Sequence, residues 1–384
     1  MPNSDELIAE LRALTPVLRS GTRQADRIAR QPEDLARILT ERGLYKLWVP
    51  TRYGGSELDL PSVLRVYEAA AYVDGSIGWA VMIGTGGGLF AAYLEPGSAE
   101  EMFSRYDALV AGSGHPTGTA ERVEGGYRAT GRWRFASGAH YATTFTANCI
   151  VTDNGKSVLD AAGQPLIRAM AFEPSQVSII ETWDTTGMRG TGSHDIEVSD
   201  AFVPERRTFS VFTDMPREPG PLYRLPFEVL TELPVTAVAL GIARHALDAF
   251  AELSRVKKAY GADTELARDP VVQANYAEAR AAWRVAKCAV EALSQEAWQS
   301  TVEETVLTDE QRAEITASCA YINATLRSRL SEIVALAGMT AGEQNHELSR
   351  AWRDLQVLGA HGSVAPRQLT VAGQMMIAPD YAIA

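Results

Sequence analysis

Apolar residues recur at helical spacing along the first hundred-odd positions of the chain. Leu7, Leu11 and Leu18 are spaced so that they share one face of a helix. The same spacing returns in later segments, interrupted by a Pro- and Gly-rich stretch at 50–55. This pattern predicts an N-terminal helical domain, to which we assign residues 1–109.

Alternation of polar and apolar residues replaces helical spacing in the middle of the chain. From 127 to 135, apolar or small residues alternate with Arg and Thr, as on a two-sided strand. Turn signals lie at 124–127 and at Asn154-Gly155. Further strand candidates are 166–172, 177–180 and 195–203. The pattern predicts a central β-barrel or β-sandwich domain over residues 110–215.

Helical spacing returns after a Pro-rich linker at 204–226. Val235, Val238 and Ile242 share a face, and two further helices fit 318–336 and 347–358. Long helices at the end of a chain are typical of an antiparallel four-helix bundle, here over residues 216–384. The order α, β, α predicts an α+β protein.

Charge and cysteine content narrow the class of protein. Lys and Arg number 36 against 48 Asp and Glu, a net charge of −12, which argues against nucleic acid or an anionic membrane as partner. The three cysteines form no CxxC pair, and residues 1–10 are unlike a signal peptide, so we expect a cytoplasmic protein. The uncharged run 77–94 could be a membrane span, but its five glycines favour a buried helix with a glycine-rich break.

Familiar nucleotide, protease and metal motifs are absent from the sequence. There is no P-loop, HExxH or G-x-S-x-G sequence and no cluster with metal-ligand spacing, so we expect no metal. The glycines at 187–192 lack the strand-to-helix context of a dinucleotide-binding loop. Any nucleotide-like cofactor must therefore be held by another fold.

Five short segments carry the candidate chemistry. They are Gly43-Leu44 with Val49-Pro50 and Tyr53-Gly54-Gly55; Asp74 to Trp79; Trp133 to Gly138; Trp183 with Gly187 to Asp195; and Arg350 with Arg353-Asp354 and His361. Together and in this order they resemble the acyl-CoA dehydrogenase superfamily across nearly the whole chain. Within it they are most similar to the two-component flavin monooxygenases, which include aryl hydroxylases, indole and dibenzothiophene oxygenases and amino-sugar nitrososynthases.

The resemblance implies the acyl-CoA dehydrogenase fold and a reduced flavin, FMN or FAD, supplied by a separate flavin reductase. It implies that O2 adds to the flavin to form a C4a-hydroperoxyflavin, which oxygenates an aromatic or heteroaromatic small molecule. It also implies a homotetramer built through the C-terminal bundle. An amino-sugar N-oxygenase is an alternative, and so is a flavin-fold binder without catalysis.

Site residues follow from the same resemblance. Ser137 is placed near flavin N5, where a hydrogen-bond partner controls the oxygenated flavin, although a serine at a strand end can also be a simple cap. His361 is placed beside flavin and substrate, where imidazole can donate or accept a proton. Candidate substrate contacts are Ser113, His115 and His140. Candidate flavin contacts are Trp133, Ser137, Trp183, Arg189, Thr191, Ser193, Arg350 and Arg353. For the two tryptophans core packing is an alternative, and for Arg350 and Arg353 an ion pair with Asp354 or Glu347.

The absence of a glutamate near the C-terminus favours an oxygenase over a dehydrogenase. A dehydrogenase of this superfamily abstracts a proton with a glutamate, yet residues 348–384 contain no Glu, and His361 stands in that neighbourhood. A base on the first helix after the β domain, Glu228 or Glu232, keeps the dehydrogenase as an alternative. The stretch 84–88 also lacks the histidine that several aryl hydroxylases carry there, which disfavours a phenol held by a His pair and favours a bulkier or non-phenolic substrate.

Overall fold

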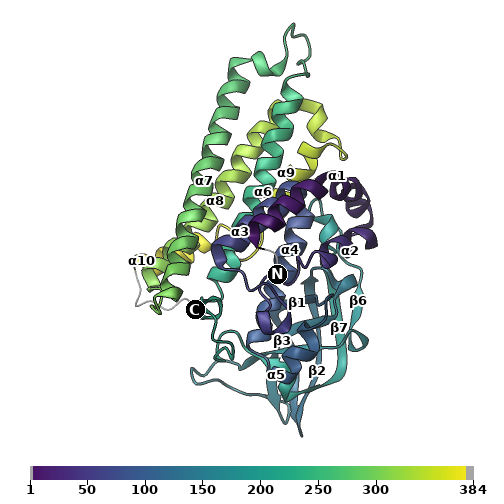
Figure 1. Ribbon diagram of the computed structural model, residues 1–384, viewed down its shortest axis with the longest axis vertical. Coiled ribbons are helices and arrows are strands. Elements are labelled where there is room, and N and C mark those ends of the chain that lie inside the picture. The colour runs from purple at the N-terminus through teal and green to yellow at the C-terminus, as the bar shows by residue number, and fades with distance from the viewer. Residues whose placement is uncertain (1–2, 378–384) are drawn as a thin grey trace.

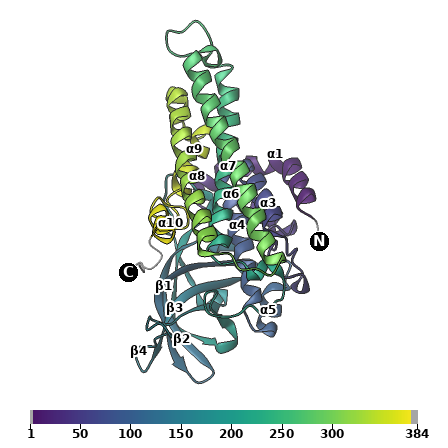
Figure 2. The same cartoon turned by 90° about the vertical axis from the view of Figure 1, so that its left-hand side faces the viewer.

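The computed structural model describes residues 3–377 and arranges them as helices, a sheet and a helical bundle. The N-terminal helices lie between the sheet below and the long bundle above (Figure 1). The same arrangement seen from the side shows α7 and α8 running together along the bundle (Figure 2). The predicted order α, β, α is confirmed.

The N-terminal part contains five helices, and a side-chain cap sets the start of each of them except α2. Asn3 and Glu6 form a reciprocal capping box at the first helix, and Asp59 caps the third by accepting from Ser62 N. Asp74 caps the fourth by accepting from Ser76 N at 2.9 Å. The helices are α1 (Ser4–Ile28), α2 (Glu33–Glu41), α3 (Leu60–Val73), α4 (Gly75–Gly88) and α5 (Pro96–Phe103).

A mixed sheet of eight strands forms the middle of the chain and makes up the central β domain expected from the alternation. Its order is β6-β7-β2-β1-β3-β5-β8, with β4 paired to β3. β1 and β3 are parallel, and the other pairs are antiparallel. The strands are β1 (Val110–Val123), β2 (Gly126–Ala136), β3 (Thr144–Asp153), β4 (Lys156–Ser157), β5 (Ile167–Phe172), β6 (Ser178–Ile180), β7 (His194–Pro204) and β8 (Thr208–Phe209).

Three long helices and two shorter ones complete the described chain. The first of them is almost wholly buried because it packs between the N-terminal helices and the rest of the bundle. The helices are α6 (Val229–Ser254), α7 (Pro270–Val302), α8 (Asp309–Leu336), α9 (Glu347–Leu358) and α10 (Gln368–Ile377). The division at 109/110 and 215/216 stays a proposal, which the positions of β1, β8 and α6 support.

Two helical stretches are long and apolar enough to cross a membrane by composition alone. They are Gly75–Ala92 and Val229–Ser254, and 78% and 89% of their apolar windows are buried inside the protein. That is the burial of core helices in a soluble protein. The glycines of 84–88 lie within α4 instead of breaking it, and a short 3-10 turn (Leu89–Ala92) follows.

Candidate active site

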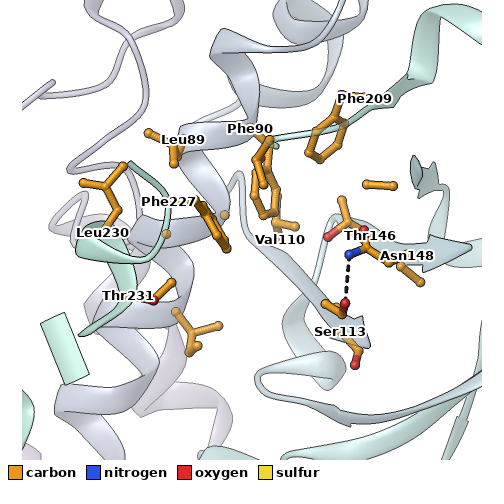
Figure 3. A pocket seen from close by; sticks show the side chains of 18 of the residues that line it. Leu89, Phe90, Val110, Ser113, Thr146, Asn148, Phe209, Phe227, Leu230 and Thr231 are labelled. Carbon is orange, nitrogen blue, oxygen red and sulfur yellow. Dashed lines mark hydrogen bonds between the residues drawn. The ribbon is translucent and has the colours of Figure 1, made fainter. Parts of the chain in front are cut away.

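A cavity of about 280 Å³ lies where α4, β1, β3 and the start of α6 meet. Its walls are mainly apolar, and Leu89, Phe90 and Phe227 present their side chains on one side of it (Figure 3). The lining residues are Trp48, Trp79, Met82, Ile83, Gly86, Gly87, Leu89, Phe90, Val110, Gly112, Ser113, Gly114, Thr146, Ala147, Asn148, Ile167, Ala169, Phe209, Ser210, Val211, Phe212, Phe227, Leu230, Thr231, Val235 and His361.

The polar part of this lining is small and uncharged. Ser113, Thr146 and Asn148 group together on β1 and β3, away from Thr231 on α6 (Figure 3). The Asn148 Nδ2 donates to the Gly114 carbonyl at 2.8 Å, which orients the amide. Within residues 3–377, no Asp, Glu, Lys or Arg lines the cavity. A bound molecule therefore meets hydroxyl, amide and imidazole groups, but no ion of the described chain.

Trp79 connects the cavity to a buried row of hydroxyl groups. Its Nε1 donates to Ser137 Oγ at 3.0 Å. Ser137 Oγ lies 2.7 Å from Ser193 Oγ, which lies 2.7 Å from Thr191 Oγ1. Thr191 donates to the carbonyl of Met188 at 2.8 Å. The structure thus brings three predicted flavin contacts, Ser137, Thr191 and Ser193, into one hydrogen-bonded row.

The number of hydroxyl protons determines which group donates and which accepts in each hydrogen bond of this row. Each hydroxyl carries one proton, and Thr191 donates its proton to the Met188 carbonyl. Thr191 therefore accepts from Ser193, and Ser193 accepts from Ser137. Ser137 Oγ already accepts from Trp79, so it presents only a remaining lone pair to anything that binds beside it.

His361 lies just beyond the end of α9 and lines the cavity. The backbone N–H of Ser363 donates to His361 Nδ1 at 3.3 Å, so the neutral ring carries its proton on Nε2. Desolvation by the surrounding residues lowers the pKa of His361 from its ordinary value. At pH 7 the ring is therefore neutral and supplies one N–H donor.

Comparison with known proteins identifies the family. The acyl-CoA dehydrogenase N-terminal domain model matches residues 12–106, and the acyl-CoA dehydrogenase C-terminal domain model matches residues 233–366. Indole-3-acetate monooxygenase of Acinetobacter baumannii is 30% identical over 346 residues, which cover 89% of this chain and 86% of that protein. The chain belongs to the acyl-CoA dehydrogenase family, on its flavin-dependent monooxygenase branch.

Two further comparisons agree with this placement. The oxygenase subunit HsaA of a flavin-dependent monooxygenase from Rhodococcus jostii is 27% identical over 377 residues, covering 94% of this chain and 95% of that subunit. XiaF from a Streptomyces species, solved with FADH2 and glycerol, has the same fold at a TM-score of 0.91 and 23% identity, covering 99% of this chain and 97% of that chain. The cofactor of this monooxygenase is a flavin.

The surroundings of Ser137 suit an isoalloxazine ring. Phe135 is 53% exposed and takes a positive φ of 69°, which is rare for a bulky residue and marks a functional position. Its ring meets that of Trp183, with centroids 6.1 Å apart, and the Arg134 guanidinium lies 4.5 Å from the Phe135 centroid. The exposed Phe135 ring, two residues before Ser137, and the half-buried Trp183 ring form a surface on which a flat ring can pack.

Trp133 does not belong to that surface. It is fully buried in the core of the β domain, donates from Nε1 to the Asn148 carbonyl at 2.8 Å and packs against Phe172. Core packing, the alternative for this residue, is what the structure shows, and Phe135 is the aromatic residue of β2 whose side chain is exposed. Trp183 remains a candidate, held by its own Nε1 donation to the Met188 carbonyl at 3.0 Å.

The predicted substrate contacts divide between the cavity and other places. Ser113 lines the cavity. His115 lies in the exposed irregular segment of β1 next to Ser113 and does not line it. His140 lies elsewhere, with its Nε2 3.4 Å from Glu181 and its ring 5.1 Å from that of His194. The structure therefore brings only Ser113 of these three to the cavity wall.

The three arginines predicted to contact the flavin, two of them near its phosphate by the family resemblance, are all engaged within the chain. Arg350 is 5% exposed and pairs through Nε with the Asp74 carboxylate at 3.1 Å. Arg353 donates to the Thr186 carbonyl at 2.6 Å, and Arg189 to the Asp26 carbonyl at 2.6 Å. The buried ion pair engages the Arg350 guanidinium, and the other two arginines hold the loop before the hydroxyl row.

The carboxylates considered for a dehydrogenase face away from the cavity. Glu228 pairs with Arg312 of α8, and both Glu232 oxygens accept from Thr316 Oγ1 at 3.0 Å. Burial raises the pKa of Glu232 to about 7, which is a consequence of its place in the bundle core. Neither lines the cavity, so the proton abstraction of a dehydrogenase has no carboxylate base there among the described residues.

Proposed function

We propose that this monooxygenase is the oxygenase component of a two-component system and oxygenates an aromatic or heteroaromatic small molecule in the cavity. A separate flavin reductase supplies reduced FMN or FAD. The observation that carries this proposal is the position of Trp79, whose indole lines the cavity, meets His361 and hydrogen-bonds to Ser137. The cavity proposed to hold the substrate therefore lies next to the predicted flavin contacts.

Ser137 is the residue that would hold a bound reduced flavin at its N5–H. The reduced flavin supplies, when bound, the electrons that activate O2. An acceptor beside N5 keeps that proton in place, and the hydroxyl row makes Ser137 an acceptor because its own proton goes to Ser193. Phe135 and Trp183 provide the adjoining aromatic surface.

His361 is the donor on the cavity side. Its neutral ring carries one proton on Nε2, and an N–H at this position stabilises negative charge that develops on oxygen during transfer to the substrate. Phe90, Phe209 and Phe227 line the cavity and exclude water, which otherwise diverts the reaction to hydrogen peroxide. Ser113 contacts the substrate on the polar wall.

We also propose a homotetramer in the cytoplasm. The outer faces of α7 and α8 expose large apolar side chains, with Val271 61%, Val285 70% and Tyr321 65% exposed, which supports association through the bundle. Since the predicted arginines are engaged internally, cations of a neighbouring subunit are the natural partners of the flavin phosphate. The free, exposed Cys288 is compatible with a reducing compartment.

Two other activities receive less support. An amino-sugar N-oxygenase acting on a nucleotide sugar needs cations for its phosphates, and the described lining holds none. An acyl-CoA dehydrogenase needs a base at the cavity, and Glu228 and Glu232 point into the bundle. A binder without catalysis leaves the hydroxyl row and His361 without a use.

Stopped-flow oxidation of reduced FMN and FAD in air tests the proposal. The protein should slow the release of hydrogen peroxide from the reduced flavin, and an aromatic substrate should be recovered with one added oxygen atom. Reoxidation at the rate of free flavin, or turnover of an acyl-CoA with an artificial electron acceptor, would contradict it.

A further inference from the structure

We infer that the substrate of this enzyme is an uncharged aromatic or heteroaromatic molecule, and that Gly86 is the position that admits its ring. The inference rests on the oxygenase function proposed above and specifies its substrate. It differs from what the name of the Acinetobacter relative implies for that protein, since indole-3-acetate carries a carboxylate.

Charge provides the first argument. The described lining contains no cationic side chain, and residues 1–2 and 378–384 contain no Lys or Arg. Arg168, on β5 between the lining residues Ile167 and Ala169, pairs with Asp214 at 3.2 Å and bonds to Thr208. A carboxylate taken into this cavity would lose its water without gaining a cation, which is strongly unfavourable.

The polar wall provides the second argument. Ser113, Thr146 and Asn148 offer neutral hydroxyl and amide groups, grouped at one side of a mainly apolar space (Figure 3). The Asn148 amide is fixed by its bond to the Gly114 carbonyl. Such groups suit a hydroxyl, carbonyl or ring N–H at one edge of a flat molecule, and the surrounding phenylalanines suit its faces.

Gly86 provides the third argument. Glycine inside a helix is unfavourable, so each glycine of α4 needs a reason. A Cβ at Gly84 would lie 2.5 Å from the Tyr45 ring, one at Gly87 2.6 Å from Val110, and one at Gly88 2.7 Å from Val49. A Cβ at Gly86 would meet nothing within 4 Å, and this residue lines the cavity. Close packing explains three of these glycines, and the open cavity explains Gly86.

A matched pair of ligands tests the charge argument. Indole-3-acetamide and indole-3-acetate have nearly the same size and differ in charge. Isothermal titration calorimetry should give a Kd about tenfold or more lower for the amide. With reduced flavin, the amide should also be oxygenated preferentially. Equal or tighter binding of the acetate would overturn the inference. Preferential binding of the amide without oxygenation of either compound would instead contradict the proposed function.

A cation introduced at Thr231 should increase the affinity of the cavity for a carboxylate ligand. Thr231→Lys places a cation at the cavity wall, and Thr231→Met is its uncharged control of similar length. The lysine variant should bind the acetate about tenfold more tightly than the methionine variant does. The same acetate affinity in both variants would show that charge does not set the preference.

Substitution at Gly86 tests whether this position leaves the space that the ring of the substrate occupies. Gly86→Leu should raise the Kd of indole-3-acetamide about tenfold or more without lowering the melting temperature, and Gly86→Ala should do so to a smaller extent. Gly84→Ala is the matched control and should lower the melting temperature, because its Cβ would collide with Tyr45. A stable Gly86→Leu variant with unchanged affinity would overturn the role given to Gly86.

Discussion

The indole of Trp79 meets the imidazole of His361 edge to face, with ring centroids 5.2 Å apart and ring planes inclined by 69°. The same indole donates to Ser137 Oγ. The two residues proposed to be catalytic, which are far apart in sequence, thus share one neighbour. Any movement of Trp79 changes the surroundings of both, so its orientation should control how well flavin oxidation is coupled to product formation.

Trp79→Phe should reduce that coupling. Phenylalanine keeps a ring beside His361 but removes the N–H that Ser137 accepts. One lost hydrogen bond is worth about 0.5–1.5 kcal/mol, so the ratio of product to hydrogen peroxide should fall roughly two- to tenfold. Trp79→Leu, which removes the ring contact as well, should lower the ratio further. An unchanged ratio in both variants would show that Trp79 only fills space.

His361 should give the reaction an acidic limit. Its pKa is lowered by desolvation, so the neutral ring persists at pH values above its folded-state pKa, which lies below about 6.5. Product formation should therefore be constant near pH 7 and fall as the pH drops through that folded-state value. His361→Asn keeps an N–H donor but cannot titrate, so its rate should lack the acidic decline.

The corresponding change at His140 is the control. Desolvation also lowers the pKa of His140, and this residue lies away from the cavity beside His194. His140→Asn should keep the acidic decline of the rate. If the decline vanished with His140→Asn and survived His361→Asn, the role given to His361 would be refuted. Both residues should make the fold less stable in acid, because the unfolded chain takes up these protons first.

The sequence pattern located the strand that ends just before Ser137 but not which of its aromatic side chains is exposed. Trp133 and Phe135 occupy the same phase of the alternation, which places both on one face of an ideal strand. The register of β2 against β7 shifts between Trp133 and Ala136, and Phe135 adopts a left-handed conformation there. This irregularity exposes Phe135 and leaves Trp133 in the core, and alternation alone contains no signal for it.

The sequence likewise contained no signal for ion pairs and hydrogen bonds between residues that are far apart along the chain. The spacing of Arg350 and Arg353 correctly placed both on helix α9, yet the partner of Arg350 is Asp74, the cap of α4. Trp79 lies in one of the segments that carry the family resemblance, but nothing in the sequence indicated its contacts with Ser137 and His361. One local pattern was missed that could have been found: Leu369, Ala372 and Met376 are spaced as on one helical face, within α10.

Thr191 should set the direction of the hydroxyl row. Thr191→Val removes the oxygen that accepts from Ser193, so Ser193 loses its preferred donor direction and can donate toward Ser137. Ser137 would then turn its proton outward, and its ability to accept the flavin N–H would fall. The release of hydrogen peroxide per reduced flavin should rise a few-fold. Thr191→Ser, which keeps the hydroxyl, should behave like the unmodified enzyme, and equal uncoupling in both variants would contradict the row's proposed direction.

Arg350 should matter for folding and not for flavin affinity. It lies buried between two carboxylates, paired with Asp74 and close enough to Asp354 to affect its charge. Burial raises the pKa of Asp354, so part of this cluster is protonated near neutral pH. Arg350→Leu leaves Asp74 buried without its cation and should lower the free energy of unfolding by about 3–5 kcal/mol in chemical denaturation. Asp74→Asn added to Arg350→Leu should recover part of that loss, because it removes the uncompensated charge while an amide oxygen can still cap α4.

Flavin affinity of the folded Arg350→Leu protein, measured at low temperature, should stay within about threefold of the unmodified enzyme. A lost phosphate contact worth about 1.4 kcal/mol would instead weaken flavin binding about tenfold. A tenfold weaker flavin complex with near-normal stability would restore Arg350 as a phosphate ligand and refute the structural role assigned to it.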